Sequence, residues 1–213
     1  MSFQTLSLPG RLPRGYLIAI LALLGALGLW FLKDNVLPYS TYDAATYSDF
    51  WDRRAGFLPH LIGGSVAVTT GLLQLWLGFT GRAKPWHRTI GKIYLAAVAI
   101  GSAGGFYLAA TTVHPATLGY RSGLFMLSTA WAITTAMAYL AVRQRDFQQH
   151  SEWMTRSYTV TFAFVSFRLA NKLLLLWGVK PDADYDAMLA WGCWALPLLL
   201  VEPLIQLRRA RRT

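Results

Sequence analysis

The chain has 213 residues, of which 54% are hydrophobic and 14% charged, whereas soluble domains carry about a quarter charged residues. This shortage of charge excludes most soluble folds. The formal net charge of +10 does not indicate a nucleic-acid partner, because no basic stripe is interleaved with stacking aromatic residues on a soluble face.

Long stretches without Asp, Glu, Lys or Arg predict an all-α, polytopic membrane bundle, because a helix needs about 20 apolar residues to cross the hydrocarbon of a bilayer. Four stretches are uninterrupted: Gly15–Leu32, Ala55–Gly81, Ile93–Tyr120 and Ser122–Val142. Two more, Ser157–Val179 and Ala187–Leu207, contain ionisable residues. The sequence therefore predicts six transmembrane helices surrounded by the lipid bilayer.

The basic residues predict the orientation of these spans. Thirteen of the 20 Lys and Arg fall on the side of the chain ends, six fall on the opposite side, and Arg168 lies within a span. Because short connections rich in Lys and Arg stay in the cytoplasm, we expect both termini to be cytoplasmic. The chain then divides into a cytoplasmic segment, residues 1–14, a six-helix transmembrane domain, residues 15–207, and a basic cytoplasmic tail, residues 208–213. The first apolar stretch also has the features of a cleaved signal peptide.

Small and polar residues follow one face of the second predicted helix. They recur at steps of four and three: His60, Gly64, Ala67, Gly71, Gln74 and Gly78. The third predicted helix has small residues at every fourth position: Ala97, Gly101, Gly105 and Ala109. Because membrane helices associate through close backbone approach and interhelical hydrogen bonds, we expect these two helices to pack as an antiparallel hairpin.

The four histidines divide between the two predicted membrane faces. His60 and His114 lie near the outer surface, and His87 and His150 lie at the two inner turns. Two histidines on one face are the arrangement expected of a bis-histidine site, because imidazole ligates haem iron, zinc and copper. His60, His87, His114 and His150 are therefore candidate metal ligands. Structural capping or contact with lipid headgroups is the alternative role of the inner pair.

Arginines accompany these histidines. Arg88 and Arg156 lie beside the inner pair, while Arg168 lies in the outer half of the membrane, where an ionisable group marks a candidate functional site. These guanidinium groups would suit haem propionates, quinone carbonyls or phosphates. Gln74 joins them as a candidate cofactor contact on the polar face of its helix. For Arg168 the alternative is snorkelling to the surface or pairing with backbone carbonyls.

Several of these motifs, in this order, resemble the DUF2306 family of predicted bacterial membrane proteins. The resemblance begins at about residue 55 and rests on these residues: His60, Gly64, Gly71, Gln74, His87, Arg88, Gly91, Tyr94, His150, Trp153, Met154, Arg156, Phe167, Arg168, Trp191 and Glu202. It implies a multi-helix integral protein of the plasma (inner) membrane and assigns no activity. The pattern is also broadly similar to the two-haem b-type cytochromes and ferric reductases, an analogy of architecture alone.

The sequence favours an electron-transfer membrane protein that binds haem b or interacts with a quinone, by itself or with other membrane redox subunits. Its cofactor contacts would be His60, His87, His150, Arg88, Arg156, Arg168 and Gln74. The alternatives are a small proton or anion transporter or channel, and a structural accessory subunit of a membrane complex. The chain has no CxxC, HExxH, P-loop or GxSxG motif, so zinc-protease, nucleotide and serine-hydrolase chemistry lack support.

Overall fold

The structure, a computed structural model, describes residues 14–80, 84–112 and 118–210. The described residues form helices joined by turns, which confirms the predicted all-α class. The helices are α1 (Arg14–Phe31), η1 (Leu32–Val36), η2 (Leu37–Thr41), α2 (Ala44–Tyr47), η3 (Ser48–Phe50), α3 (Arg54–Thr80), α4 (Lys84–Thr111), α5 (Leu118–Arg143), α6 (Phe147–Thr161), α7 (Ala163–Leu176) and α8 (Ala183–Ala210).

Five continuous segments within the described ranges are long and apolar enough to cross a membrane: Gly15–Thr41, Arg54–Thr80, Pro85–Thr111, Leu118–Arg143 and Asp184–Ala210. Helices α6 and α7 pass the same test together, although their axes bend by 42° at Phe162. The described residues therefore hold five continuous candidate spans, and six if the bent pair of α6 and α7 crosses the membrane as one span.

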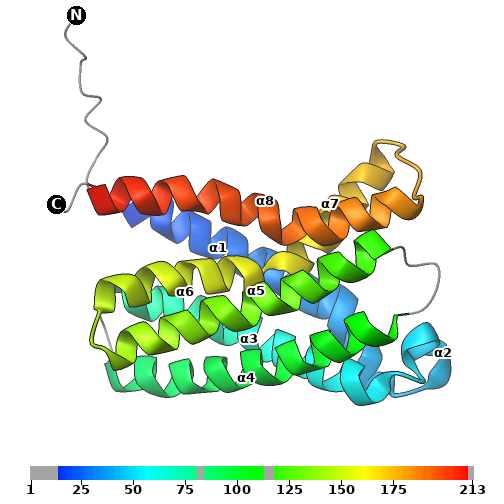
Figure 1. The fold of residues 1–213 in the computed structure, drawn as a ribbon, viewed down its shortest axis with the longest axis horizontal. Helices are drawn as coiled ribbons and strands as arrows, with labels where there is room; N and C mark the ends of the chain where they lie inside the picture. Colours follow the sequence, from blue (N-terminus) through cyan, green and yellow to red (C-terminus); the bar gives the residue numbers. More distant parts are fainter. Residues whose placement is uncertain (1–13, 81–83, 113–117, 211–213) are drawn as a thin grey trace, which may run out of the picture.

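The spans are antiparallel neighbours with two distinct ends (Figure 1). We call the end where α4 and α6 begin and α8 stops the turn end, and the end where α3, α5 and α8 begin the cavity end. Helix α1 also begins at the turn end (Figure 1), so the described parts of the chain start and finish on one side of the bundle. The cytoplasmic orientation of that side stays a prediction.

Two sequence-based boundaries were wrong. The third span was expected at Ile93–Tyr120, but α4 covers Lys84–Thr111 and α5 begins at Leu118, because the charge-free stretch includes a connection between helices. His87 and His150 were expected at turns, yet both lie within the first turns of helices. Asp146 caps α6 by accepting a hydrogen bond from the Gln149 backbone N–H at 2.9 Å, which also lowers the pKa of this carboxyl group.

Helices α3 and α4 form the antiparallel hairpin that their small residues predict, and their backbones touch. A Cβ atom added to Gly63 would lie 2.6 Å from the Ala97 carbonyl oxygen, and one added to Gly104 would lie 2.6 Å from the Gly56 carbonyl oxygen. Such approach is possible only where the side chain is a hydrogen atom. A Cβ atom added to Gly64, the next residue, would meet no atom within 4 Å, although the Gly64 backbone nitrogen would lie 3.4 Å from a Cβ atom added to Gly101.

A buried core joins this hairpin to the other helices. It contains Ala67, Tyr94, Ala97, Val98, Leu127, Trp131, Tyr158, Val160, Phe162, Ala163, Val165 and Cys193. Helix α1 lies at the edge of the bundle and packs Leu24, Leu27 and Phe31 against this core. At the cavity end a second, aromatic cluster forms around Tyr47 and Phe57. It holds the segment between α1 and α3 against the end of the bundle.

Candidate functional site

A cavity of about 310 Å³ enters the bundle from the cavity end, a volume at the lower limit of small-molecule sites. Helices α3, α4, α5, α6 and α7 form its walls, and residues of α1, α8, η1, η2 and η3 also line it. The walls are largely apolar and aromatic, with Phe57, Leu61, Leu127, Trp131 and Phe164 among them. Aromatic walls with a few polar groups are typical of sites for flat organic ligands.

Among the histidines that the structure describes, His60 lines this cavity. Its Nδ1 lies 2.8 Å from the Gly101 carbonyl oxygen on α4. Because a carbonyl oxygen only accepts, Nδ1 carries a proton, and in the neutral imidazole Nε2 then keeps its lone pair. The imidazole also meets Trp131 and Phe164 edge to face, with ring centroids 6.3 and 5.5 Å away. The site therefore presents a hydrogen-bond acceptor whose orientation is fixed by three neighbours.

Two glycines, Gly105 and Gly64, leave room around this imidazole because they have no side chain. A Cβ atom at Gly105 would lie 3.3 Å from His60 Nδ1 and 2.5 Å from the Ser128 hydroxyl, so a larger residue at this position would displace the ring. A Cβ atom at Gly64, one turn along α3 from His60, would meet no atom within 4 Å. The glycines of the predicted stripe thus contribute to the cavity as well as to helix packing.

A buried network of hydroxyl groups begins among the residues that line the cavity. Trp131 Nε1 donates to the Thr161 hydroxyl at 2.8 Å, and the Tyr94 hydroxyl lies 2.7 Å from Thr161 and 2.6 Å from Ser157. Ser157 in turn lies 2.7 Å from the Thr135 hydroxyl. The network joins α4, α5 and α6 beside the break at Phe162, where the bilayer offers no water to satisfy polar groups.

Charged residues of both signs line the cavity: Asp49, Arg53, Arg168 and Asp186. Arg53 donates to the Thr112 hydroxyl at 3.0 Å and to the Asp49 backbone carbonyl at 3.1 Å. Arg168 and Asp186 both lie within electrostatic range of the Tyr120 phenol. Two guanidinium groups and two carboxylates leave this set with no formal net charge, which does not favour an anion over a neutral ligand.

The predicted site residues Gln74, His87 and His150 lie toward the turn end. Gln74 is 5% exposed, and its Nε2 donates to the His87 carbonyl oxygen at 2.6 Å, so it ties α3 to α4 away from the cavity. His150 Nδ1 lies 2.9 Å from the Ala138 carbonyl oxygen. His87 and His150 are within electrostatic range of each other. The structure thus brings the inner pair together and places His60 in a separate site.

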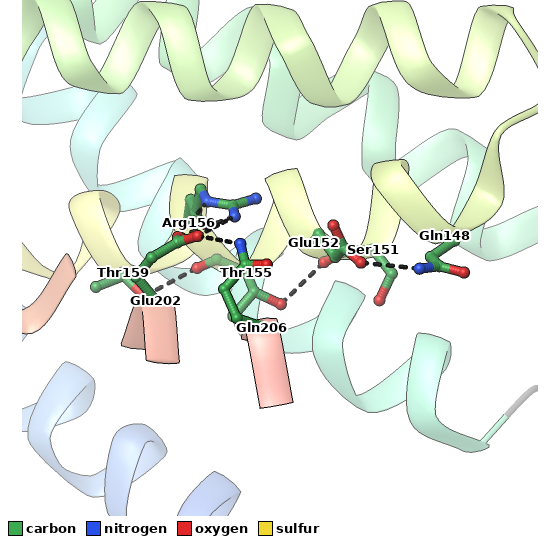
Figure 2. Close-up of polar contacts among 8 residues, drawn as sticks. All are labelled: Gln148, Ser151, Glu152, Thr155, Arg156, Thr159, Glu202 and Gln206. Carbon is green, nitrogen blue, oxygen red and sulfur yellow. Dashed lines mark hydrogen bonds and ion pairs between the residues drawn. The ribbon is translucent and has the colours of Figure 1, made fainter. Parts of the chain in front are cut away.

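Two of the three predicted arginines lie outside the cavity. Arg156 forms a bidentate ion pair with Glu202 of α8, through Nε and Nη2 at 2.9 Å each (Figure 2). The same guanidinium stacks on Trp153 with its Cζ atom 4.6 Å from a ring centroid, and Gln206 donates to Glu202 at 2.6 Å. These contacts fasten α6 to α8. Arg88 is exposed near the start of α4.

Of the residues predicted from the sequence as cofactor contacts, His60 and Arg168 line the cavity, and most of the other lining residues were not predicted. Arg53, Asp49 and Asp186 belong to connections or helix starts that resemble ordinary hydrated segments. In the sequence, Trp131 and Thr161 look like ordinary residues of apolar helices. They line the cavity because α5 packs against α6, where Trp131 donates a hydrogen bond to Thr161. His114, the fourth candidate metal ligand, lies outside the described residues.

Comparison with known proteins agrees with this architecture. The family model described as predicted membrane protein (DUF2306) matches residues 57–205, which contain the cavity walls of α3, α4, α5, α6 and α7. No curated protein and no solved structure matches the chain. The matched region covers well over half of the sequence and includes His60, His87, His150 and Arg168. The chain therefore belongs to the DUF2306 family of predicted membrane proteins.

Proposed function

We propose that this membrane protein interacts with a quinone, and that the cavity holds the reduced hydroquinone form beside His60. The observation that carries the proposal is the His60–Gly101 hydrogen bond of 2.8 Å. It leaves Nε2 as an acceptor, and a hydroquinone hydroxyl is a donor. The oxidised quinone has only carbonyl acceptors and would find no proton on this nitrogen.

The walls and the charges of the cavity support the same ligand class. Phe57, Trp131 and Phe164 offer aromatic surface to a flat ring. The balanced charges of Asp49, Arg53, Arg168 and Asp186 suit a neutral headgroup better than an anion. A volume of about 310 Å³ is enough for a single substituted ring, with any isoprenoid tail left outside.

His60 has one role in this proposal, as the acceptor of the first proton. Oxidation of a hydroquinone to a quinone releases two protons and two electrons. The hydroxyl facing His60 gives its proton to Nε2, and the guanidinium groups of Arg53 and Arg168 stabilise the resulting phenolate. The second hydroxyl would release its proton to water at the open end of the cavity, and the two electrons would leave to a redox partner, a role that haem b or another subunit of a membrane redox complex would fill.

Calorimetric titration of the detergent-purified protein with duroquinol and with duroquinone tests the proposal. Loss of a hydrogen bond costs about 1 kcal/mol or more, so the wild type should bind the reduced form about tenfold more tightly than the oxidised form. His60→Ala should remove this preference, and His87→Ala, which removes an imidazole at the turn end, should keep it. Equal affinities for both forms in the wild type would contradict the proposal.

Haem b binding stays a prediction beside this one. In the bundle, His87 and His150 are the two described histidines near each other, whereas His60 lies with the aromatic wall of the cavity. A haem held through imidazole nitrogens would therefore draw on the pair at the turn end.

Proton transport is a second candidate function, and the broken span favours it. Transporter sites are often formed where membrane helices are interrupted near the bilayer midplane. Here the break at Phe162 adjoins Thr161, the hydroxyl that links the cavity lining to Tyr94 and Ser157. Proton flux into liposomes that is lost in Thr161→Val, a variant of similar shape without the hydroxyl, would favour transport. Absence of flux in the wild type would exclude it.

A further inference from the structure

Long polar side chains of α4 reach α6 across the bundle, although each of the two helices packs against α5 rather than against the other. Both helices begin at the turn end and run in the same direction (Figure 1). The Tyr94 hydroxyl of α4 lies 2.6 Å from the Ser157 hydroxyl of α6. His87 and His150 each precede these residues by seven positions, about two helical turns or 10.5 Å, which returns to nearly the same face. The two imidazoles therefore lie at a similar level of the bundle, and they are within electrostatic range of each other.

The nitrogen atoms of these imidazoles differ in their partners. His150 Nδ1 donates to the Ala138 carbonyl oxygen at 2.9 Å, so its Nε2 keeps a lone pair. His87 Nδ1 is buried and has no hydrogen-bond partner among the described residues. Buried polar atoms in native proteins almost always have a partner, so this nitrogen is a candidate to bind a ligand.

The surroundings hold the pair in position. Gln74 fixes the backbone of His87 through a hydrogen bond of 2.6 Å to its carbonyl oxygen. The His87 ring lies beside Gly78, where an added Cβ atom would come within 3.8 Å of the ring. An imidazole whose second nitrogen donates to a backbone carbonyl, as in His150, has the orientation that metal-ligating histidines usually show.

We infer that His87 and His150 form one metal site at the turn end, with a late first-row transition metal bound between the unpartnered Nδ1 of His87 and Nε2 of His150. Neutral imidazole nitrogen suits zinc and copper ions and also haem iron, and the metal source is left to the experiment. The site is separate from the hydroquinone cavity. It gives the sequence-predicted inner histidines a shared function.

Metal analysis of the purified protein tests this inference. The wild type, expressed in medium supplemented with copper, zinc or a haem precursor, should retain about one metal atom per chain. His87→Ala and His150→Ala should each lower the retained metal at least about tenfold, the effect expected of ligand loss. His60→Ala is the matched control, because it removes an imidazole at the cavity end and should leave the metal content unchanged.

An absorption spectrum before and after dithionite separates the sources: a Soret band identifies haem iron, and bound metal without one identifies an ion. If either variant fails to fold, X-ray absorption of the wild type still decides the matter, since the inference requires two imidazole nitrogens on the metal. The inference is overturned if the wild type retains no metal in any medium, or if His60→Ala loses metal as fully as His87→Ala. Duroquinol binding does not enter this test, so each proposal can fail alone.

Discussion

Asp43 illustrates how a single exposed side chain supports the cavity. Its carboxylate accepts hydrogen bonds from the backbone N–H and the hydroxyl of Thr46, both at 2.8 Å, and so caps the four-residue helix α2. That helix carries Tyr47, whose hydroxyl donates to the Tyr39 carbonyl oxygen at 2.9 Å. Tyr39 and its neighbour Phe57 both line the cavity.

Because the Asp43 carboxylate caps α2, the free energy of unfolding depends on pH. Hydrogen bonds from Thr41 and Thr46 lower the pKa of Asp43 from 3.8 to about 2. Because the folded value lies below the unfolded one, the stabilisation is complete above about pH 4 and disappears as the pH falls through about 2. Thermal unfolding of the wild type and of Asp43→Ala in detergent should differ at pH 6 and converge near pH 2. A difference that persists unchanged at pH 2 would contradict this role.

At the scale of the helices, the contact between α3 and α4 distinguishes two adjacent glycines, of which Gly64 lines the cavity. Gly63 and Gly64 are consecutive in the same helix but face different surroundings. A Cβ atom at Gly63 would lie 2.6 Å from the Ala97 carbonyl oxygen and 2.7 Å from the Gly101 nitrogen, both backbone atoms, whereas a Cβ atom at Gly64 meets nothing within 4 Å.

This difference predicts opposite effects of two adjacent substitutions. Gly63→Ala should lower the free energy of unfolding by about 1–3 kcal/mol, because the two backbones must separate. Gly64→Ala should have no destabilising effect and can gain up to about 1 kcal/mol from helix propensity. Unfolding of both variants in mixed micelles measures the difference. Equal losses of stability would show that the backbones are not in contact at Gly63.

The features that could be predicted from the sequence are those whose cause lies within a short stretch of the chain. The apolar lengths of the spans, the α3–α4 hairpin and the same-side placement of the chain's described ends all follow from hydropathy and small-residue spacing. The break at Phe162 has no such cause, since neither Pro nor Gly occurs beside it. Ser157 and Thr161 there bond with residues of α4 and α5, and such partners depend on the assembled bundle.

At the scale of the whole molecule, polar groups gather at two separate levels. His60 could be selected from the sequence because an imidazole is rare on an apolar helix. Trp131 and Thr161 could not, since their place in the cavity depends on the relative register of three helices. The pairing of Arg156 with Glu202 likewise depends on how α8 lies along α6 (Figure 2). Spacing within one helix cannot reveal which ionisable groups meet across two.

The central claim is that the bundle presents His60 Nε2 as an unprotonated acceptor to a ligand in the cavity. Nitrogen NMR of the protein labelled at histidine measures this directly, with the His60 signals assigned by their absence in His60→Ala. The account predicts a protonated Nδ1, an unprotonated Nε2 and a change of the Nε2 resonance when duroquinol is added. A protonated Nε2 in the free protein, or a spectrum that duroquinol leaves unchanged, would contradict it.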